Sequence, residues 1–166
     1  MTRAASQATT LLTASNGKLR ARSDDGTTAF SWWHEGYPSA TYRVALAIYA
    51  YHIDSDWYVP SPADSTQLVF YDFPSDTATW RPVQSKVKGM IEMMAAKYGP
   101  YPYLREKYGH AQFTFGGGEE NQTISSMGSS TEMVVARVPE DVRFAPVAGV
   151  AETSLSNRRW GRKRGY

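Results

Sequence analysis

Residues 97–126 read KYGPYPYLREKYGHAQFTFGGGEENQTISS. The Gly99-Pro100 dipeptide predicts the end of a helix, because proline lacks the N–H that a helix requires and disfavours the helical conformation of the residue before it. The proline-rich segment that follows predicts a loop, HAQFTF a short strand, residues 116–118 a turn or bulge, and ENQTISSMG a further extended segment. The chain should therefore pass from a helix through a loop into a sheet.

An amphipathic pattern precedes this stretch, from about residue 79 to residue 98. Its apolar residues recur at helical spacing along one face, and they are Val83, Val87, Met90, Ile91, Met94 and Ala95. Further upstream, TYRVALAIYAYHI (41–53) predicts a central strand and QLVFYDF (67–73) a second strand of the same sheet, since both are rich in β-branched and aromatic residues. We predict an α+β fold with a mainly antiparallel or mixed β-sheet, one long amphipathic helix over about 79–98, and an irregular carboxyl-terminal segment.

Two turn signals divide the first third of the chain. Asn16-Gly17 separates TLLTAS from KLRARS, and residues 24–26 separate KLRARS from TTAFSWWHE. Such Asn-Gly and Asp-Gly dipeptides are typical of tight turns between paired strands. We therefore expect two successive β-hairpins.

Composition indicates a folded single domain. The chain has 166 residues, 13% of them aromatic and 20% charged, which is unlike the composition of disordered proteins. The absence of cysteine excludes disulfides, thiolate metal sites and cysteine nucleophiles. No run approaches the roughly 18 apolar residues of a membrane span, and the opening residues do not form a signal peptide. We expect a soluble protein with no membrane partner, and the sequence leaves its compartment open.

The net charge of +2 is too small to indicate a nucleic-acid partner. The charge is uneven, however, because residues 158–164 read RRWGRKR. This basic run is interpreted as a solvated tail rather than as a nucleic-acid contact.

The stretch 97–126 resembles the M1 family of zinc aminopeptidases, in which a helix leads into a G-P-Y-P loop, a strand and then G-G/A-M-E-N/H. Here the last motif appears as Gly117-Gly118-Glu119-Glu120-Asn121. Residues 15–51 resemble the region where that family's amino-terminal β-sandwich joins its thermolysin-like domain. The resemblance covers about residues 9–136, and it implies that residues 1–136 combine the end of the sandwich with the first lobe of the catalytic domain.

In that family the motif lies along the substrate cleft, where its backbone pairs with the bound peptide and its glutamate holds the free α-amino group. The resemblance implies a substrate-binding set of Gly117, Gly118, Glu119, Glu120 and Asn121, with Glu120 as the amine-binding residue. The residue types suit this chemistry, because a carboxylate attracts an ammonium and glycine permits a close backbone approach.

Glu119 stands where the family usually has methionine. Adjacent strand residues point to opposite faces, so Glu119 need not enter the same site as Glu120. Glu119, Glu120 and His110 are the candidate catalytic residues, with no role assigned among them.

The resemblance stops after Ala136, where the family has H-E-x-x-H and then a third zinc ligand. Residues 137–166 instead read RVPEDVRFAPVAGVAETSLSNRRWGRKRGY, and no histidine follows His110. Zinc hydrolysis needs about three protein ligands and an open water position. We therefore expect no cofactor, with zinc bound only by a site that the motifs do not reveal. Residues 137–166 are a divergent basic tail, either an out-of-frame readout of a longer gene or simply a divergent ending.

Two weaker metal signals lie elsewhere. His52, Asp54 and Asp56 alternate along an extended stretch and could hold a cation from one side, although a solvated strand face is the simpler interpretation. The pair His34-Glu35 lacks a second histidine, and we interpret it as belonging to a loop.

Three functions remain open. The first is an aminopeptidase-like remnant that keeps a peptide- or amine-binding cleft but is not an active zinc peptidase. The second is a hydrolase with remodelled chemistry, acting on an ester, amide or glycoside through carboxylates or histidines. The third is a structural or binding protein. The partner expected from the first is a peptide or small amine. We also expect a homo-oligomer, because apolar surface left uncovered by the missing half must be hidden.

Overall fold

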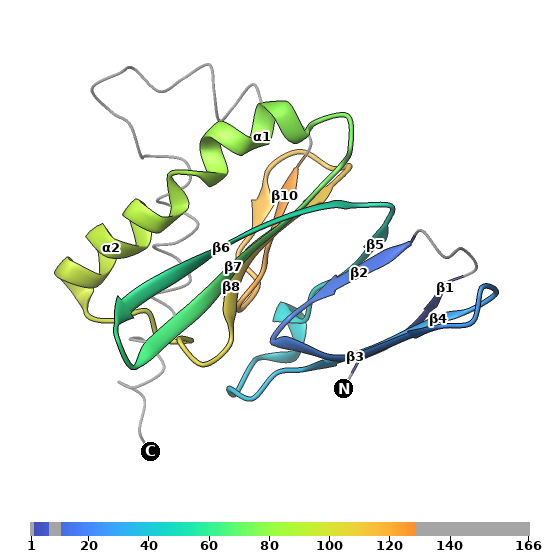
Figure 1. Ribbon diagram of the computed structural model, residues 1–166, viewed down its shortest axis with the longest axis horizontal. Coiled ribbons are helices and arrows are strands. Elements are labelled where there is room, and N and C mark those ends of the chain that lie inside the picture. Colours follow the sequence, from blue (N-terminus) through green and yellow to red (C-terminus); the bar gives the residue numbers. More distant parts are fainter. Residues whose placement is uncertain (1, 7–10, 129–166) are drawn as a thin grey trace.

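The computed structural model describes residues 2–6 and 11–128 of the chain (Figure 1). At its centre is a five-stranded sheet of order β6-β7-β8-β10-β9. Its strands in that order are β6 (His52–Ser61), β7 (Asp64–Asp72), β8 (Lys107–Phe113), β10 (Ser125–Gly128) and β9 (Gly118–Glu119). The β7–β8 and β8–β10 pairs are parallel, whereas β6–β7 and β10–β9 are antiparallel. The α+β class with a mixed sheet is therefore confirmed.

Two helices connect β7 to its parallel neighbour β8, and they cover one face of the sheet (Figure 1). They are α1 (Thr77–Gln84) and α2 (Val87–Tyr98), which join into one bent helix at the predicted place. The interruption lies at Ser85 and Lys86, where the N–H of Lys86 bonds to the carbonyl oxygen of Val83 at 3.1 Å, a tighter turn than that of an α-helix. Gly99, with φ of 95°, ends α2 as predicted. Among the described residues, no helix is both long and apolar enough to cross a membrane.

The predicted apolar face of the helix forms the first core. Val83, Val87, Met90 and Ile91 pack with side chains of the five-stranded sheet. The cluster is completed by Tyr58, Leu68, Phe70, Tyr101, Tyr103 and Tyr108.

A second core lies on the opposite face of the sheet. There β2 (Leu12–Ser15) and β5 (Leu46–Tyr49) form a separate two-stranded antiparallel sheet. Successive residues of a strand point to opposite faces, so Val69 and Tyr71 face these strands while their neighbours face the helices. The buried members of this core are Ala14, Trp33, Ala45, Ala47, Tyr51, Val69, Tyr71, Ala111 and Ile124.

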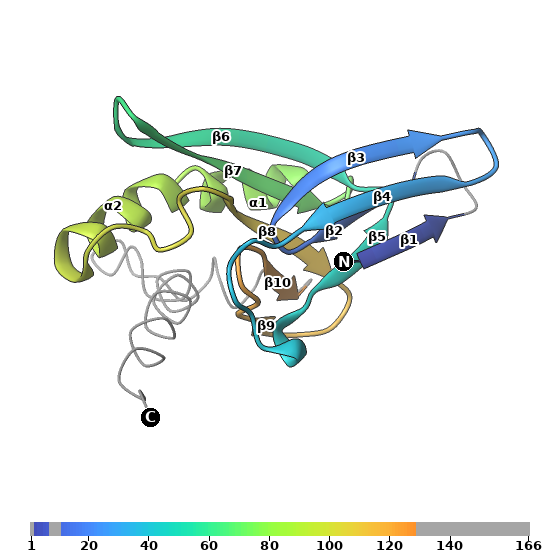
Figure 2. The ribbon, with the colours of Figure 1, turned by 90° about the horizontal axis from the view of Figure 1, so that it is seen from below.

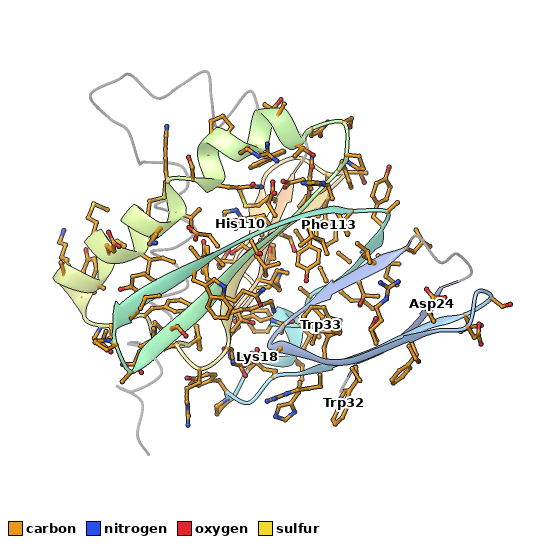
Figure 3. All side chains as sticks on the ribbon, viewed as in Figure 1. Lys18, Asp24, Trp32, Trp33, His110 and Phe113 are labelled. Carbon is orange, nitrogen blue, oxygen red and sulfur yellow. The ribbon has the colours of Figure 1, made fainter. Side chains whose placement is uncertain are left out.

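A third sheet has the order β1-β4-β3 and consists of β1 (Thr2–Ser6), β4 (Ala29–His34) and β3 (Lys18–Asp24). It extends away from α1 and α2, toward the right of Figure 2. Trp33 points from β4 toward the second core, whereas Trp32 points outward (Figure 3). The predicted β3–β4 hairpin is confirmed, with Gly26 at φ of 86° and its N–H bonded to the Asp24 carboxylate at 3.0 Å.

The hairpin predicted at Asn16-Gly17 is wrong, because β2 pairs with β5 and β3 pairs with β4. The chain turns a corner there instead. Gly17 has φ of 70°, and a Cβ at this position would overlap the main-chain carbonyl of His34. The buried Asn16 side chain donates to the carbonyl oxygens of Arg43 at 3.1 Å and Gln122 at 2.5 Å, and it accepts from the N–H of Ala45 at 2.6 Å. Asn16 therefore joins distant segments rather than closing a local turn.

The single central strand predicted over residues 41–53 is also wrong. Thr41–Arg43 is a 3-10 helix, labelled η1, and β5 and β6 belong to different sheets. The chain changes sheet at Tyr51, whose ring packs edge-on against Tyr71 and whose hydroxyl donates to the carbonyl oxygen of Gln112 at 2.7 Å. The second predicted strand, residues 67–73, is confirmed as the end of β7.

Candidate functional site

Strand β9 lies at one end of the five-stranded sheet and presents the glycine-rich motif. Gly118 and Glu119 pair with Met127 and Ser126 of β10. In the part of the chain that the structure describes, no strand pairs with the other edge of β9. Gly117, with φ of 92°, has open space where a Cβ would stand. Such an edge can accept an extended peptide as an added strand.

Glu120 follows β9 directly and is held by Arg43 from η1, which lies beside β9 (Figure 2). Arg43 donates from Nη1 to the main-chain oxygen of Glu120 at 2.7 Å, and its Nη2 lies 3.7 Å from Oε1 of the carboxylate. The side chain of Arg43 is 17% exposed and that of Glu120 is 33% exposed. The guanidinium therefore orients Glu120 and offsets part of its charge, while solvent still reaches the carboxylate.

The other two polar residues of the motif have different surroundings. Glu119 is exposed on β9. Asn121 is buried, and its side chain donates to the hydroxyl of Ser126 at 2.9 Å. Asn121 therefore ties the segment after β9 to β10, which is a structural contact rather than a free binding group.

Residues 120–123 form a turn that is held by contacts from loops of the amino-terminal part of the chain. Thr123 has φ of 65°, a left-handed conformation that is uncommon for a β-branched residue and persists only when the surroundings impose it. The N–H of Gly17 donates to the Thr123 hydroxyl at 2.7 Å, and Gln122 donates from Nε2 to Oε1 of Glu35 at 3.1 Å. The Thr123 hydroxyl also lies 3.3 Å from Oε2 of Glu35.

Glu35 belongs to a buried ionisable cluster with Glu106 and Lys107. Glu106 is 6% exposed, and its Oε1 accepts from the N–H of Gly36 at 2.5 Å, while its Oε2 has no hydrogen-bond partner. Burial, a hydrogen bond to Glu106 and repulsion from that carboxylate together raise the pKa of Glu35 to about 7. The cluster therefore favours one proton on this pair of carboxyl groups.

Lys107 is 2% exposed and anchors the corner at Gly17. Its ammonium donates to the carbonyl oxygens of Ser15, at 2.6 Å, and Gly17, and lies 4.9 Å from the centre of the Trp33 ring. Burial lowers the pKa of Lys107 to about 7, against the opposing effect of the nearby glutamates.

His110, a catalytic candidate, is enclosed in the sheet at 2% exposure (Figure 3). Its Nε2 lies 3.1 Å from the Tyr108 hydroxyl, its ring packs edge-on against Phe70, and its Nδ1 has no partner. Burial lowers the pKa of His110 to about 4, which keeps the ring neutral. Strand β10 separates β8 from β9, so the fold does not bring His110 together with Glu119 or Glu120.

The metal candidates His52, Asp54 and Asp56 alternate along β6, as predicted. Their surroundings do not suit a metal, because Asp54 lies 3.4 Å from Nε2 of His52 and 3.2 Å from the guanidinium of Arg81. The chain has three histidines, at the end of β4, the start of β6 and the interior of β8. Across residues 2–6 and 11–128, no group of three or more His, Asp or Glu side chains could hold a metal ion.

Sequence reasoning missed Arg43, Asn16 and the cluster of Glu35, Glu106 and Lys107. The available signal was the Glu-Lys pair at 106–107, placed directly before the predicted strand and between tyrosines. Charged residues at the start of a buried strand need partners, although the sequence does not say which.

No protein-family model and no curated protein matches the chain. Solved structures do match its fold. Aminopeptidase A of Legionella pneumophila, in complex with aspartic acid, is 17% identical with a TM-score of 0.69 over 87% of this chain and 17% of that one. A two-domain M1 zinc metallopeptidase bound to L-tryptophan is 16% identical with a TM-score of 0.63 over 85% and 31%. The M1 zinc metallopeptidase of Deinococcus radiodurans is 15% identical with a TM-score of 0.60 over 73% and 28%.

At these identities the likeness shows the fold alone. The chain spans less than a third of the length of each of these proteins. It therefore has an aminopeptidase-like fold, that of part of the M1 zinc metallopeptidases.

Proposed function

We propose that the chain is an aminopeptidase-like remnant that binds a peptide or small amine along β9 and is not an active zinc peptidase. The observation that carries this proposal is the position of Glu120, at the end of a strand with an open edge and oriented by Arg43. The aminopeptidase-like fold supports it, because an aminopeptidase and two M1 zinc metallopeptidases match the fold of this chain.

In this proposal the ligand's extended backbone pairs with β9, and its ammonium group meets the Glu120 carboxylate. Gly117, with open space where a Cβ would stand, leaves room for the backbone to approach. Arg43 stands near Oε1, and within the described residues no donor bonds to Oε2. A charge-assisted hydrogen bond from an ammonium to Oε2 would complete the site.

The absence of zinc chemistry is part of the proposal. The chain's three histidines are all described, and they lie on three strands without a common ligand geometry. The hydrolase alternative has no observation in its favour, since His110 is enclosed and apart from the two glutamates. A general binding protein would differ from the proposed remnant only in having no selectivity for a free amine.

The division into residues 1–136 and 137–166 is likewise a proposal, since the second part lies outside the described residues. An out-of-frame readout and a divergent ending remain the two alternatives. The coding DNA separates them: H-E-x-x-H in another frame after codon 136 would support the first, and its absence from both other frames would exclude it.

Binding of L-phenylalaninamide and its N-acetyl derivative, measured by calorimetry, tests the amine site. We expect only the free amine to bind, and Glu120→Gln to weaken it about tenfold, because a charge-assisted hydrogen bond is lost. Glu119→Gln is the matched control, since it removes the same charge from the neighbouring residue. Equal binding of the acetylated compound, or equal weakening by the control, would contradict the proposal. Stoichiometric zinc together with aminoacyl hydrolysis would contradict the inactive state.

A further inference from the structure

Glu35 connects a buried carboxyl pair to the turn that carries Glu120. One of its oxygens, Oε1, accepts from the N–H of Tyr37 at 3.1 Å and from Nε2 of Gln122 at 3.1 Å. The other, Oε2, lies 3.3 Å from the Thr123 hydroxyl. Glu35 therefore touches both residues that fix the end of this turn.

The contacts indicate where a proton must lie. Glu106 uses Oε1 to accept from the N–H of Gly36, the residue after Glu35, and its buried Oε2 has no hydrogen-bond partner. A carboxylate oxygen cannot remain buried and unpaired without a cost, and two adjacent carboxylates repel each other. A proton on Glu35 that is donated to Oε2 of Glu106 gives this oxygen a partner and removes the repulsion between the two carboxylates.

Charge balance supports the same assignment. While Lys107 is protonated, two ionised glutamates beside it would leave one uncompensated negative charge in a cluster whose Glu106 and Lys107 are buried. If the two carboxyl groups share one proton, the three side chains are neutral together, which burial favours.

We propose that Glu35 is a positioning residue for the amine site: while it shares a proton with Glu106, it holds Gln122 and Thr123 and thereby keeps Glu120 in place beside β9. This inference rests on the proposed function. Loss of the proton leaves two carboxylates in contact, and Glu35 moves because Glu106 is the more deeply buried of the two. The Gln122 side chain then loses its acceptor, whereas the Thr123 hydroxyl keeps its bonds to the Gly17 N–H and the Gln122 carbonyl oxygen.

The direction of the pH dependence follows from all the groups around the pair. Burial and Glu106 raise the pKa of Glu35 to about 7, so the proton is held in mildly acidic solution and lost as the pH rises through neutrality. The other ionisable groups near the pair are Lys107 on β8, Tyr101 and Arg105 in the loop before it, Tyr37 in the loop after β4, and His34 at the end of β4. Lys107, Arg105 and the hydrogen bonds that Glu35 accepts from the Tyr37 N–H and from Gln122 favour ionisation, whereas desolvation and the repulsion between the two carboxylates oppose it.

The first experiment follows the proton itself in the full chain. With glutamate labelled at the carboxyl carbon, NMR between pH 5 and 9 should show a titration near neutrality in the wild type. The titration should be absent from Glu35→Gln, whose amide can still donate to Glu106 and accept from Gln122. No carboxyl titration near neutrality, or one that persists in Glu35→Gln, overturns the shared proton.

The second experiment measures L-phenylalaninamide affinity over the same pH range. The ligand's own amine titrates equally in both experiments, so its effect cancels in the ratio of wild-type affinity to Glu35→Gln affinity. We expect this ratio to fall about tenfold from pH 5.5 to pH 8.5. Glu35→Ala should bind weakly at every pH, while Glu106→Gln should behave like Glu35→Gln. A ratio that does not change with pH overturns the positioning role.

A third readout separates this inference from the proposed function. If the wild type binds no amine at any pH, the proposed function fails, but the backbone amide shifts of residues 120–123 still report the turn. Shifts that move with pH in the wild type and not in Glu35→Gln support positioning by Glu35. Shifts that do not move in the wild type overturn it.

Discussion

Arg43 donates a 2.7 Å hydrogen bond to the main-chain oxygen of Glu120, a residue 77 positions later in the chain. This bond ties the short helix η1 to the segment after β9. It places a cation beside the carboxylate that the proposed function assigns to the amine. The position of Glu120 therefore depends on the amino-terminal part of the chain as well as on its own strand.

Removal of the Arg43 side chain should destabilise the fold modestly. The ion pair is partly exposed and contributes little, but the hydrogen bond to the main-chain oxygen is largely shielded, so Arg43→Met should cost about 1–2 kcal/mol. Urea unfolding measures this free energy. Arg20→Met, on exposed β3, is the control and should change stability by less than about 0.5 kcal/mol. An equal effect of the two substitutions would show that the Arg43 bond does not matter.

The Asn16 side chain should contribute more than Arg43. It is buried and bonds three main-chain groups from two distant segments, and Asn16→Ala leaves all three without a partner. We expect a loss of about 3 kcal/mol in the free energy of unfolding, measured with urea. Asn16→Asp is the matched comparison, since it keeps the acceptor for Ala45 but loses both donated bonds. Stability of Asn16→Ala close to that of the wild type would argue against this role.

The long helix depends on local sequence patterns, whereas the role of Asn16 depends on partners far away in the chain. The 79–98 helix follows from local periodicity and from Gly99, and the β3–β4 turn follows from a local Asp-Gly signal, so both were predicted. The Asn16-Gly17 signal is equally local but was misleading, because the Asn16 amide bonds Gln122, 106 residues away. No local pattern records such a partner.

The same reason limits prediction of the site. The glycine-rich motif identified β9 and Glu120, which lie where a peptide could approach. The residues that hold Glu120 in place were not predicted, since Arg43 and Glu35 come from the amino-terminal segments and meet the motif only in the folded chain. His110 was a candidate because histidine is chemically versatile, and its burial depends on the helices that cover β8.

His110 should make the protein sensitive to acid. Its pKa is lowered from about 6.5 to about 4 by burial, so the unfolded chain binds a proton between these values while the folded chain does not. This contribution to stability is present above pH 6.5 and is lost as the pH falls toward 4, by about 3 kcal/mol in total. Unfolding of the wild type and His110→Gln at several pH values should show the wild type losing its advantage over this window. A constant difference between them would refute the assignment.

Glu35 should make stability depend on pH in the direction opposite to that of His110. Its pKa is raised from 4.5 to about 7, first by burial and then by Glu106, so the folded chain binds a proton that the unfolded chain has lost. This contribution is fully present below pH 4.5 and is lost as the pH rises through 7. The stability of the wild type relative to Glu35→Gln should therefore fall between pH 5 and 8, as measured by urea unfolding. A relative stability that rises over that interval would contradict the raised pKa.

Strands β5 and β6 carry exposed large apolar side chains. Strand β6 is at one end of the five-stranded sheet, and within the described residues no strand pairs with its outer edge. Exposed large apolar side chains recur from η1 into β6, and they are Tyr42, Val44, Leu46, Ile48, Tyr49, Ile53, Trp57 and Val59. Large exposed apolar surfaces of this kind are uncommon on monomers.

We predict that a second copy of the chain covers this surface. Light scattering after size-exclusion chromatography should show a dimer or larger assembly at micromolar concentration. Ile53→Ser with Trp57→Ser should weaken association at least tenfold, because each removes buried apolar area worth about 1–2 kcal/mol. Met93→Ser, at an exposed position on α2, is the matched control and should leave the assembly intact. A wild type that remains monomeric would contradict self-association, and equal weakening by Met93→Ser would place the interface on the helices instead.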